Sequence, residues 1–406
     1  MARVCMVVFN EYCSDPRVRR EAEALIERGD SVDCICLQDL KAKARSLRGV
    51  RLFAISGKYR GVKRIGHLAA YLRFFCFAFL QVSLLHLRRP YDIVQVHTMP
   101  DFLVFTTIVP KLSGAKIILD IHDLMPELYM AKFGGDYRNW IVRSIIWIEN
   151  RSIAFADKTI AVHEPHLNVL VKHGNPRSKF SVLLNVPDHR IFVRPTSACT
   201  RQGSFRLIYH GTIPDRDRAG LDIALRAVAR IRNDIPDLEF HVIGDGAGMA
   251  RLRSLAQELN LNSCVQFIPA VPVEQLPPML LEASVGIIPY AADSFTHCVL
   301  PTKLLEYVAL GIPTIVSRLH AIEAYFDDEM VGYFETGNET ELADRILSFY
   351  RHPEIAARLA SNAAKFSEKY NWQQHREIYF RLVDSLLPKR TFLTQYELKG
   401  KENGER

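Results

Sequence analysis

A lysine and a glutamate stand three residues apart in the segment Pro301–Pro313, which reads PTKLLEYVALGIP. If this segment begins as a helix, Lys303 and Glu306 lie on one face of it. The N–H groups and partial positive charge of a helix N-terminus suit a diphosphate, and Lys303 would add a full charge. Glu306 can accept two hydrogen bonds, as the cis-diol of a ribose would offer. The spacing favours a nucleotide site that also includes Thr302 and Leu304, although an amphipathic helix with a surface ion pair has the same spacing.

This segment resembles the donor-site signature of the retaining glycosyltransferases of family 4, which have the GT-B fold. In that family a first glutamate usually stands eight positions before a second. Glu306 matches the second, but Cys298 occupies the place of the first, which leaves open how the hydroxyl groups of the donor sugar are held. The resemblance implies that the substrate is a UDP- or GDP-linked sugar and that the protein needs neither a cofactor nor a metal.

The loop from His210 to Asp222, HGTIPDRDRAGLD, is expected to contact the phosphates. Family members often have Gly-Arg here, followed by Lys-Gly several residues later. In this chain Thr212 follows Gly211 and replaces the family's arginine. The resemblance therefore assigns the phosphate contact to Arg218, with Arg216 as the second candidate. For both arginines a solvated loop side chain is the alternative.

Gly244, Gly246 and Gly248 follow an apolar run and precede a predicted helix. The third glycine is one position early for a dinucleotide fingerprint, and the resemblance instead makes this the turn where Gly244 and Gly246 let the backbone approach the nucleotide. Ile268, one strand later, is expected to line the base. Asp215-Arg-Asp217 spells the Asp-x-Asp metal motif of the GT-A fold, but it lies in a loop between arginines, and we expect a chance match.

In the first half, Leu119–Glu127 (LDIHDLMPE) resembles the family's His-Asp segment. His122 is expected to hydrogen-bond the transferred sugar, since it follows a predicted strand and α/β sheets bind ligands at the carboxyl ends of their strands. Glu127 is expected to face the acceptor. His97 ends another predicted strand and resembles the first histidine of a paired pattern, but a structural role fits it equally well.

The acceptor side is also expected to include Ser14–Glu21, SDPRVRRE, which resembles a family segment that opens the first helix. Asp15 stands at the helix start, and Arg17 and Arg20 would meet an anionic acceptor such as a lipid diphosphate. Helix capping and surface ion pairs are the alternative.

Strands and helices alternate in two series, which predicts an α/β protein of the GT-B class with two Rossmann-like, doubly wound domains facing across a cleft. We expect domains at 1–195 and 204–370, a helix at 371–388 that crosses back to the first domain, and a flexible tail at 389–406. The predicted strands are Arg3–Asn10, Ser31–Leu37, Ile93–Val96, Ile117–Ile121, Thr159–Val162, Arg206–His210, Glu239–Ile243, Val265–Ile268, Val285–Pro289 and Thr314–Ser317.

The composition of the 406 residues, 48% hydrophobic and 24% charged, is that of a globular protein. A net charge of +7 is too dispersed for a nucleic-acid binder but suits anionic ligands or an anionic membrane. Eight cysteines without a Cys-x-x-Cys pair indicate a reducing compartment. With no signal-peptide pattern, we expect a cytoplasmic protein.

The segment 61–89 is apolar and aromatic and has basic flanks. A membrane span needs about 20 apolar residues with few charges, but a span here would separate the next strand from its sheet. We therefore expect a domain helix that is either buried or in peripheral contact with the inner face of the cytoplasmic membrane.

The resemblance extends over nearly the whole chain and implies a retaining, metal-independent glycosyltransferase of hexosyl or N-acetylhexosaminyl groups. The implied acceptor is a polyprenyl-linked lipid or a growing surface glycan, as in lipopolysaccharide, capsule or exopolysaccharide biosynthesis. Two alternatives stay open. One is a non-hydrolysing sugar-nucleotide epimerase with the same fold. The other is a degenerate GT-B protein that binds a glycan or a partner, which Cys298 and Thr212 would suit.

Overall fold

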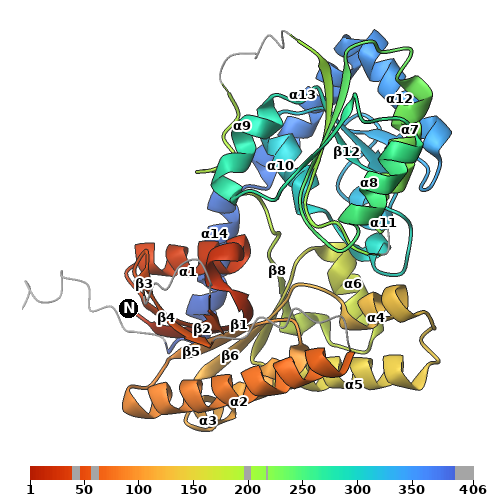
Figure 1. The fold of residues 1–406 in the computed structure, drawn as a ribbon. Helices are drawn as coiled ribbons and strands as arrows, with labels where there is room; N and C mark the ends of the chain where they lie inside the picture. The colour runs from red at the N-terminus through yellow and green to blue at the C-terminus, as the bar shows by residue number, and fades with distance from the viewer. Residues whose placement is uncertain (39–45, 56–63, 196–202, 216–217, 389–406) are drawn as a thin grey trace, which may run out of the picture.

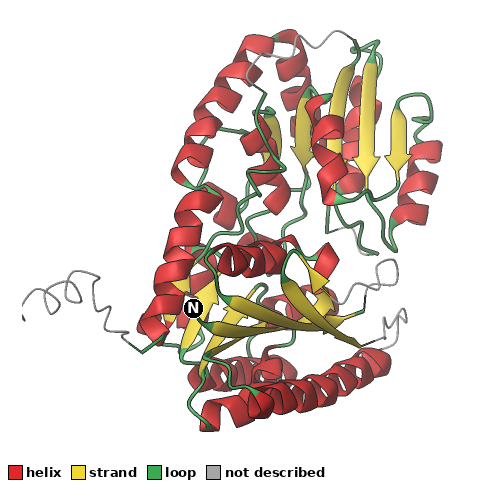
Figure 2. Cartoon of the chain, turned by 90° about the vertical axis from the view of Figure 1, so that its left-hand side faces the viewer, coloured by secondary structure: helices red, strands yellow, loops and turns green. Residues whose placement is uncertain are grey.

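The computed structural model describes residues 1–38, 46–55, 64–195, 203–215 and 218–388. The chain forms two α/β units, one above the other in Figure 1, each built on one sheet. Figure 2 shows helices on both faces of the sheets. The predicted architecture of two doubly wound domains is therefore present. The expected flexible tail and the residue Arg216 lie outside the described residues.

The N-terminal sheet has eight strands in the order β3-β4-β2-β1-β5-β6-β7-β8, all parallel except the pair β3–β4. Its central strands are nearly continuous apolar runs that are buried on both faces, as expected for a parallel sheet between two helical layers. The strands are β1 (Arg3–Glu11), β2 (Ser31–Leu37), β3 (Ser46–Leu47), β4 (Val50–Ile55), β5 (Ile93–His97), β6 (Lys116–Ile121), β7 (Lys158–Ala161) and β8 (Phe180–Val182).

The helices of this unit follow the strands in the usual alternation. Three of this unit's described helices begin with a side-chain cap. Asp15 accepts from the Val18 N–H at 3.2 Å, Asn139 from the Ile141 N–H at 2.9 Å and His163 from the His166 N–H at 3.1 Å. The helices are α1 (Pro16–Glu27), α2 (Arg64–Arg88), α3 (Ile108–Leu112), α4 (Met125–Phe133), α5 (Trp140–Phe155) and α6 (Glu164–Lys172), with short 3₁₀ turns η1 (Tyr12–Ser14), η2 (Asp101–Thr107) and η3 (Arg177–Lys179).

The C-terminal sheet has six parallel strands in the order β11-β10-β9-β12-β13-β14. Its strands are β9 (Phe205–His210), β10 (Leu238–Ile243), β11 (Val265–Ile268), β12 (Val285–Ile288), β13 (Thr314–Ser317) and β14 (Gly332–Phe334). The helices are α7 (Leu221–Ile231), α8 (Met249–Glu258), α9 (Leu276–Leu281), α10 (Thr302–Leu310), α11 (His320–Glu323), α12 (Glu339–Arg351) and α13 (Pro353–Lys369), with 3₁₀ turns η4 (Val273–Gln275) and η5 (Thr296–Cys298).

The strand order reverses between β1 and β5 in the first sheet and between β9 and β12 in the second. In such sheets the connections leave in opposite directions at the reversal, and ligands bind in the crevice at the carboxyl ends of the strands. Loops at these ends meet between the two units, where the Ser294 hydroxyl donates to the Glu127 carbonyl at 3.0 Å. The two crevices therefore face one another.

The last helix, α14 (Trp372–Leu386), runs from the C-terminal unit back along the N-terminal unit in Figure 1. The Tyr379 hydroxyl donates to Gln95 of β5 at 2.6 Å, and Arg28 forms an ion pair with Asp384 at 2.9 Å. The crossing helix that the sequence predicts is thus present and covers the first sheet.

Helix α2 is long and apolar enough to cross a membrane by length and composition. Phe74, Ala78 and Val82 form a buried stripe that packs into the core of the first sheet. The opposite side of the helix exposes leucines, among them Leu80 and Leu87 at 57% and 70%. The helix is therefore a layer of the domain that presents a second apolar face outward.

Every predicted strand is present, and each agrees within one residue at either end. The strands that the sequence prediction missed lie at or next to sheet edges: β3, β4, β8 and β14. Strands at or next to an edge are often short or half exposed, as β4 is, so their apolar runs are interrupted and the strand signal is weak.

Candidate functional site

Lys303 lies in the first turn of α10, at the carboxyl edge of the second sheet, and is 7% exposed. Its Nζ is 3.8 Å from the ring centroid of Tyr209 and 5.1 Å from that of Tyr290. Burial lowers the pKa of Lys303 to about 7, and the charge of Glu306 only partly offsets this. The site thus holds a poorly neutralised ammonium group, which an added anion would stabilise.

No side chain caps the N-terminus of α10 among the described residues, since the residue before it is Pro301. The N–H groups of Thr302 and Lys303 are therefore placed for a ligand. Leu304 was predicted to share this role, but its N–H donates to the Pro301 carbonyl at 3.0 Å and its side chain is fully buried. That prediction was wrong, because Leu304 faces the core beneath the helix.

Glu306 ends a chain of three polar groups at the carboxyl end of β9. His210 Nε2 lies 2.6 Å from Glu306 Oε2, and His210 Nδ1 lies 3.0 Å from the Tyr307 hydroxyl. Burial raises the pKa of Tyr307 well above its ordinary value, so the hydroxyl keeps its proton and can donate to Nδ1. Nε2 then donates to Glu306, which fixes the carboxylate and leaves its second oxygen for a ligand.

The glycine loops pack backbone against backbone around this site. A Cβ on Gly244 would lie 2.0 Å from the Gly211 carbonyl oxygen, and one on Gly246 would lie 2.0 Å from that of Ile213. A Cβ on Gly211 would lie 2.9 Å from Lys303 Nζ. These positions require glycine, and Gly211 leaves the room that the ammonium group occupies.

The other predicted donor-side residues differ in their surroundings. Arg218 forms an ion pair with Asp293 at 3.1 Å. The pKa of Lys132 in the first unit is lowered first by burial and then by the charge of Arg218. Arg218 therefore lies near the facing domain. Thr212 is exposed on the same loop. The Ile268 carbonyl accepts from the Gly244 N–H at 2.9 Å, and its contact with a base stays a prediction.

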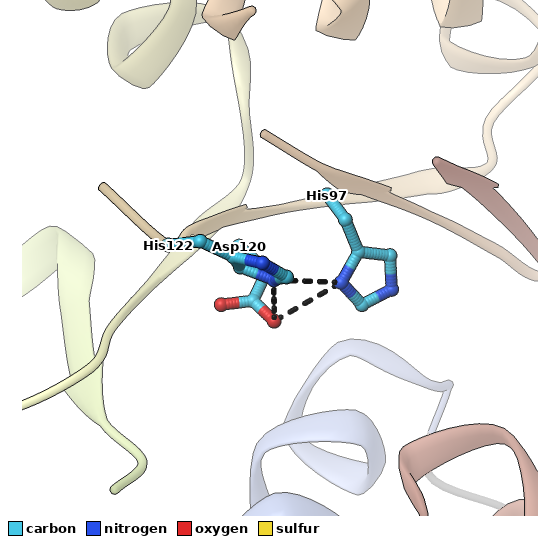
Figure 3. Close-up of side chains that lie close together, drawn as sticks. All are labelled: His97, Asp120 and His122. Atoms are coloured by element: carbon cyan, nitrogen blue, oxygen red, sulfur yellow. Dashed lines mark hydrogen bonds and ion pairs between the residues drawn. The ribbon is translucent and has the colours of Figure 1, made fainter. Parts of the chain in front are cut away.

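Across from α10, Asp120 at the end of β6 contacts three cationic or potentially cationic groups. Figure 3 shows two of them, His97 and His122. Arg17 donates to both of its oxygens at 2.9 and 2.8 Å. His97 Nδ1 and His122 Nε2 lie 3.2 and 3.3 Å from Oδ2, and the two nitrogens are 3.2 Å apart. The described residues thus contain one His-Asp-His group with metal-like spacing, but its carboxylate already has the guanidinium as a counter-ion.

The charges of this cluster fix the state of His122. Burial would raise the pKa of Asp120, but Arg17 and then His122 lower it well below its ordinary value. For His122, burial acts to lower the pKa, and the carboxylate of Asp120 outweighs it and raises the pKa above 6.5. Nε2 of His122 therefore carries a proton directed at Asp120, and the remaining ring nitrogen can face a ligand.

A pocket of about 300 Å³ lies between the two units. The first unit lines it with His122, His166 and Asn185, and the second with Tyr290, Cys298 and Thr302. The predicted sugar-binding histidine and the start of α10 thus share one cavity.

The predicted acceptor-side residues are mostly structural. Asp15 caps α1, and Arg20 stacks on Trp372 at 4.7 Å and donates to Asn185 at 2.8 Å. Both arginines of this group, Arg17 and Arg20, are buried, although Arg17 still lines the pocket. The expectation of free, acceptor-facing arginines was wrong, because both side chains turn inward to buried partners.

Glu127 and His97 are also buried. Glu127 is 1% exposed and accepts from the Tyr137 hydroxyl at 2.7 Å, with His173 at 3.2 Å. The prediction that Glu127 faces the acceptor was therefore wrong. His97 is fully buried behind His122, so its structural alternative is the one that the structure favours.

The sequence prediction missed Asp120 and His166. Asp120 and His122 stand two residues apart at a strand end, and this spacing places both side chains on one face of the sheet. A charged residue inside a strand that is otherwise apolar was the available signal. His166 follows the strand β7 by five residues, and nothing local distinguishes it from a helix-surface histidine.

Two family models match consecutive parts of the chain. The model described as Glycosyltransferase Family 4 matches residues 17–190, and the model described as Glycosyl transferases group 1 matches residues 202–366. The boundary between the two matches falls in the segment that joins the two sheets.

Among curated proteins, the D-inositol 3-phosphate glycosyltransferase of Streptomyces avermitilis is 26% identical over 335 residues, which cover 78% of this chain and 70% of that protein. The protein of the same name from Streptomyces scabiei is 28% identical over 161 residues. That match covers 37% of this chain and 35% of the length of that relative.

Among solved structures, sucrose-phosphate synthase from Thermosynechococcus elongatus matches with a TM-score of 0.77 at 16% identity, over 95% of this chain and 99% of that one. Anabaena HepE in complex with UDP matches with a TM-score of 0.72 at 14% identity, over 95% and 100%. These similarities extend across both sheets and the crossing helix, and they show that the fold is GT-B.

Proposed function

The chain belongs to the GT-B glycosyltransferases of the family 4 type, and on that premise we propose that it transfers a hexosyl or N-acetylhexosaminyl group from a UDP- or GDP-linked donor, with retention and without a metal ion. The observation that carries this proposal is the pair Lys303 and Glu306 at the uncapped start of α10. Pro301 and Thr302 at that start line a pocket with His122 on its other wall.

The chemistry asks for stabilisation of a leaving diphosphate while positive charge develops on the sugar. Fixed positive charge and N–H dipoles at the leaving group lower that barrier. Lys303 and the first N–H groups of α10 supply both, and Glu306, held by His210, would bind the ribose. His122, whose pKa Asp120 raises against the effect of burial, would hold a sugar hydroxyl on the opposite wall.

We propose a lipid-linked or growing surface-glycan acceptor, with the enzyme at the inner face of the cytoplasmic membrane. The names of the Streptomyces relatives describe transfer to a phosphorylated polyol, which suggests an anionic acceptor. The outer helical layer that covers the first sheet supports the proposed contact with the membrane. It exposes apolar side chains on α2, α3 and α5, namely Leu72, Leu80, Leu84, Leu87, Ile108, Leu112, Trp140 and Trp147.

The charge of this layer, here called the α2–α5 face, suits an anionic bilayer. Helices α2 and α3 contain no carboxylate, and the single one on α5, Glu149, is fully buried. Arg88, Arg143 and Arg151 are exposed among the apolar side chains. Exposed Leu and Trp interleaved with Arg are the composition of an interfacial membrane surface.

The test of the proposed activity is release of free UDP or GDP from a panel of nucleotide sugars, with and without a polyprenyl diphosphate-linked sugar acceptor. Glu306→Ala is expected to lower acceptor-dependent release at least about 100-fold, since the ribose contact and its support by His210 are lost together. Glu258→Ala on the exposed side of α8 is the matched control and should retain wild-type rates. Equal release by Glu306→Ala and the wild type would contradict the proposal.

The test of the membrane contact is co-sedimentation with vesicles of phosphatidylglycerol and phosphatidylethanolamine. The wild type should bind them, more weakly as salt increases, and should not bind phosphatidylcholine vesicles. Replacing Leu80 and Leu87 by glutamate should reduce binding about tenfold or more, because two apolar contacts become repulsive charges. Val193→Glu introduces the same charge at an exposed apolar site in the interdomain linker and should bind like the wild type. Unchanged binding by the double variant would refute this contact.

A further inference from the structure

The C-terminal unit's wall of the interdomain pocket lacks a carboxylate at the position where family 4 glycosyltransferases usually have a glutamate. Cys298 occupies that place, and its thiol donates to the Ser294 carbonyl at 3.5 Å. Burial and then the charge of Glu127 raise the pKa of Cys298 to about 11, so the thiol keeps its proton. A thiol is a weak acceptor, and its neighbours Val299, Leu300 and Pro301 are apolar. Cys298 therefore cannot replace the hydroxyl contacts that a carboxylate would make, and a polar group on the opposite wall could supply them.

His166 is placed on that opposite wall with its hydrogen-bonding capacity unused. It belongs to the first turn of α6, lines the pocket and is 2% exposed. Within the part of the chain that the structure describes, neither Nδ1 nor Nε2 has a hydrogen-bond partner. Burial, and then the charges of His163 and Arg17, hold its pKa well below the ordinary value. The ring is thus neutral and offers one donor and one acceptor.

His166 contacts His163 through both its ring and its backbone, and the two rings pack edge to face with centroids 5.7 Å apart. His163 caps α6 through Nδ1, which accepts from the His166 N–H at 3.1 Å. Nε2 of the same histidine lies 3.3 Å from the Leu300 nitrogen on the other wall. A neutral imidazole has one acceptor nitrogen, so the approach of Leu300 is a close contact rather than a second hydrogen bond. It places the start of α6 beside the loop that leads into α10.

We infer that His166 is a ligand of the transferred sugar and makes hydrogen bonds to its hydroxyl groups that Cys298 cannot make. A sugar hydroxyl both donates and accepts, so one or two hydroxyls can satisfy both ring nitrogens. Leaving two buried polar atoms without partners destabilises the empty protein, and a bound hexose removes that cost. This inference rests on the proposed function and adds a specificity residue to it.

The test compares the affinity for UDP with that for UDP-glucose by isothermal titration calorimetry, with GDP and GDP-mannose as the second pair of probes. His166→Phe keeps the volume of the ring and removes both nitrogens. We expect it to bind the nucleotide alone like the wild type and to lose about tenfold or more of the extra affinity that the sugar confers. His166→Gln, which can still donate and accept, should recover part of that difference.

A stability measurement separates a binding role from a structural one. His166→Phe should have a thermal midpoint equal to or above that of the wild type, because it removes unpaired buried polar atoms. His320→Phe, at an exposed histidine of α11, is the control. The inference is refuted if His166→Phe keeps the full preference for the nucleotide sugar, or if it weakens nucleotide and nucleotide-sugar binding equally. If the wild type binds no nucleotide, the proposed function itself fails.

Discussion

Replacing Lys303 with methionine is expected to lower kcat/KM for transfer by about 10²- to 10³-fold, the usual effect of removing one group that stabilises a developing negative charge. The side chain is buried between Tyr209 and Tyr290 and faces Gly211, so solvent cannot replace its charge at the diphosphate. Steady-state kinetics with the donor identified from the nucleotide-sugar panel would measure the loss.

The pH dependence of binding identifies Lys303 as the cause. Because burial lowers its pKa to about 7 in the free protein, the ammonium group is present below pH 7 and lost above it. A bound diphosphate favours the charged form and raises the pKa again. The Kd for UDP-glucose should therefore be flat below pH 7 and rise about tenfold for each pH unit above it. In Lys303→Met this break should disappear.

Two controls accompany this prediction. Lys365→Met makes the same change on the exposed surface of α13 and should leave both the rate and the pH profile unchanged. Lys303→Met itself should be at least as stable as the wild type, because it removes a buried cation whose counter-charge is incomplete. If Lys303→Met keeps the wild-type break near pH 7, another group causes it, and the assignment of Lys303 is wrong.

The positions of Lys303, Glu306 and the glycines could be predicted from sequence because they are local, while their role in donor binding stays a proposal. Lys303, Glu306 and the glycines belong to strand–loop–helix turns, and in such turns residue spacing along the chain fixes the spacing in space. The same logic placed every predicted strand, since continuous apolar runs between turn residues have few other solutions.

The acceptor side could not be predicted in the same way because its contacts are long-range. Arg17 was expected to meet an anionic acceptor, but Asp120, more than a hundred residues later, binds it in the core. Glu127 was expected to face the acceptor, but Tyr137 and His173 cover it. A spacing rule gives the face of a helix on which a charge lies, and only the tertiary fold decides whether that face is buried.

Asp120→Asn is expected to destabilise the first domain by about 3–5 kcal/mol and to lower kcat more than about 100-fold, with a smaller effect on donor KM. Asparagine has nearly the shape of aspartate, so the loss would be electrostatic. The buried guanidinium of Arg17 would lose its main counter-ion, which is the costly way to break a buried pair. His122 would lose the carboxylate that raises its pKa, so less of it would be charged at neutral pH. Urea unfolding and steady-state kinetics would measure the two effects.

The free energy of unfolding at low pH offers a second measurement of the role of Asp120. The pKa of Asp120 is depressed in the folded protein, so its stabilisation is present above the ordinary value of 3.8 and is lost as the pH falls through the folded pKa. The Asp120→Asn variant lacks this titration and should show a flatter loss of stability toward low pH than the wild type.

Combining Asp120→Asn with Arg17→Met separates the role of Asp120 in stability from its role in catalysis. Asp120→Asn alone leaves Arg17 with Glu21, at 3.3 Å, as its remaining counter-ion. The double variant removes the buried guanidinium, and Glu21, whose pKa burial already raises to about 7, can become neutral. The double variant should therefore be more stable than Asp120→Asn alone. It should not regain activity, because His122 still lacks its counter-ion. If the double variant regained the wild-type rate, Asp120 would serve only to neutralise Arg17, and the charge of His122 would have no part in the transfer. If Asp120→Asn alone were as stable as the wild type, the buried network itself would be refuted.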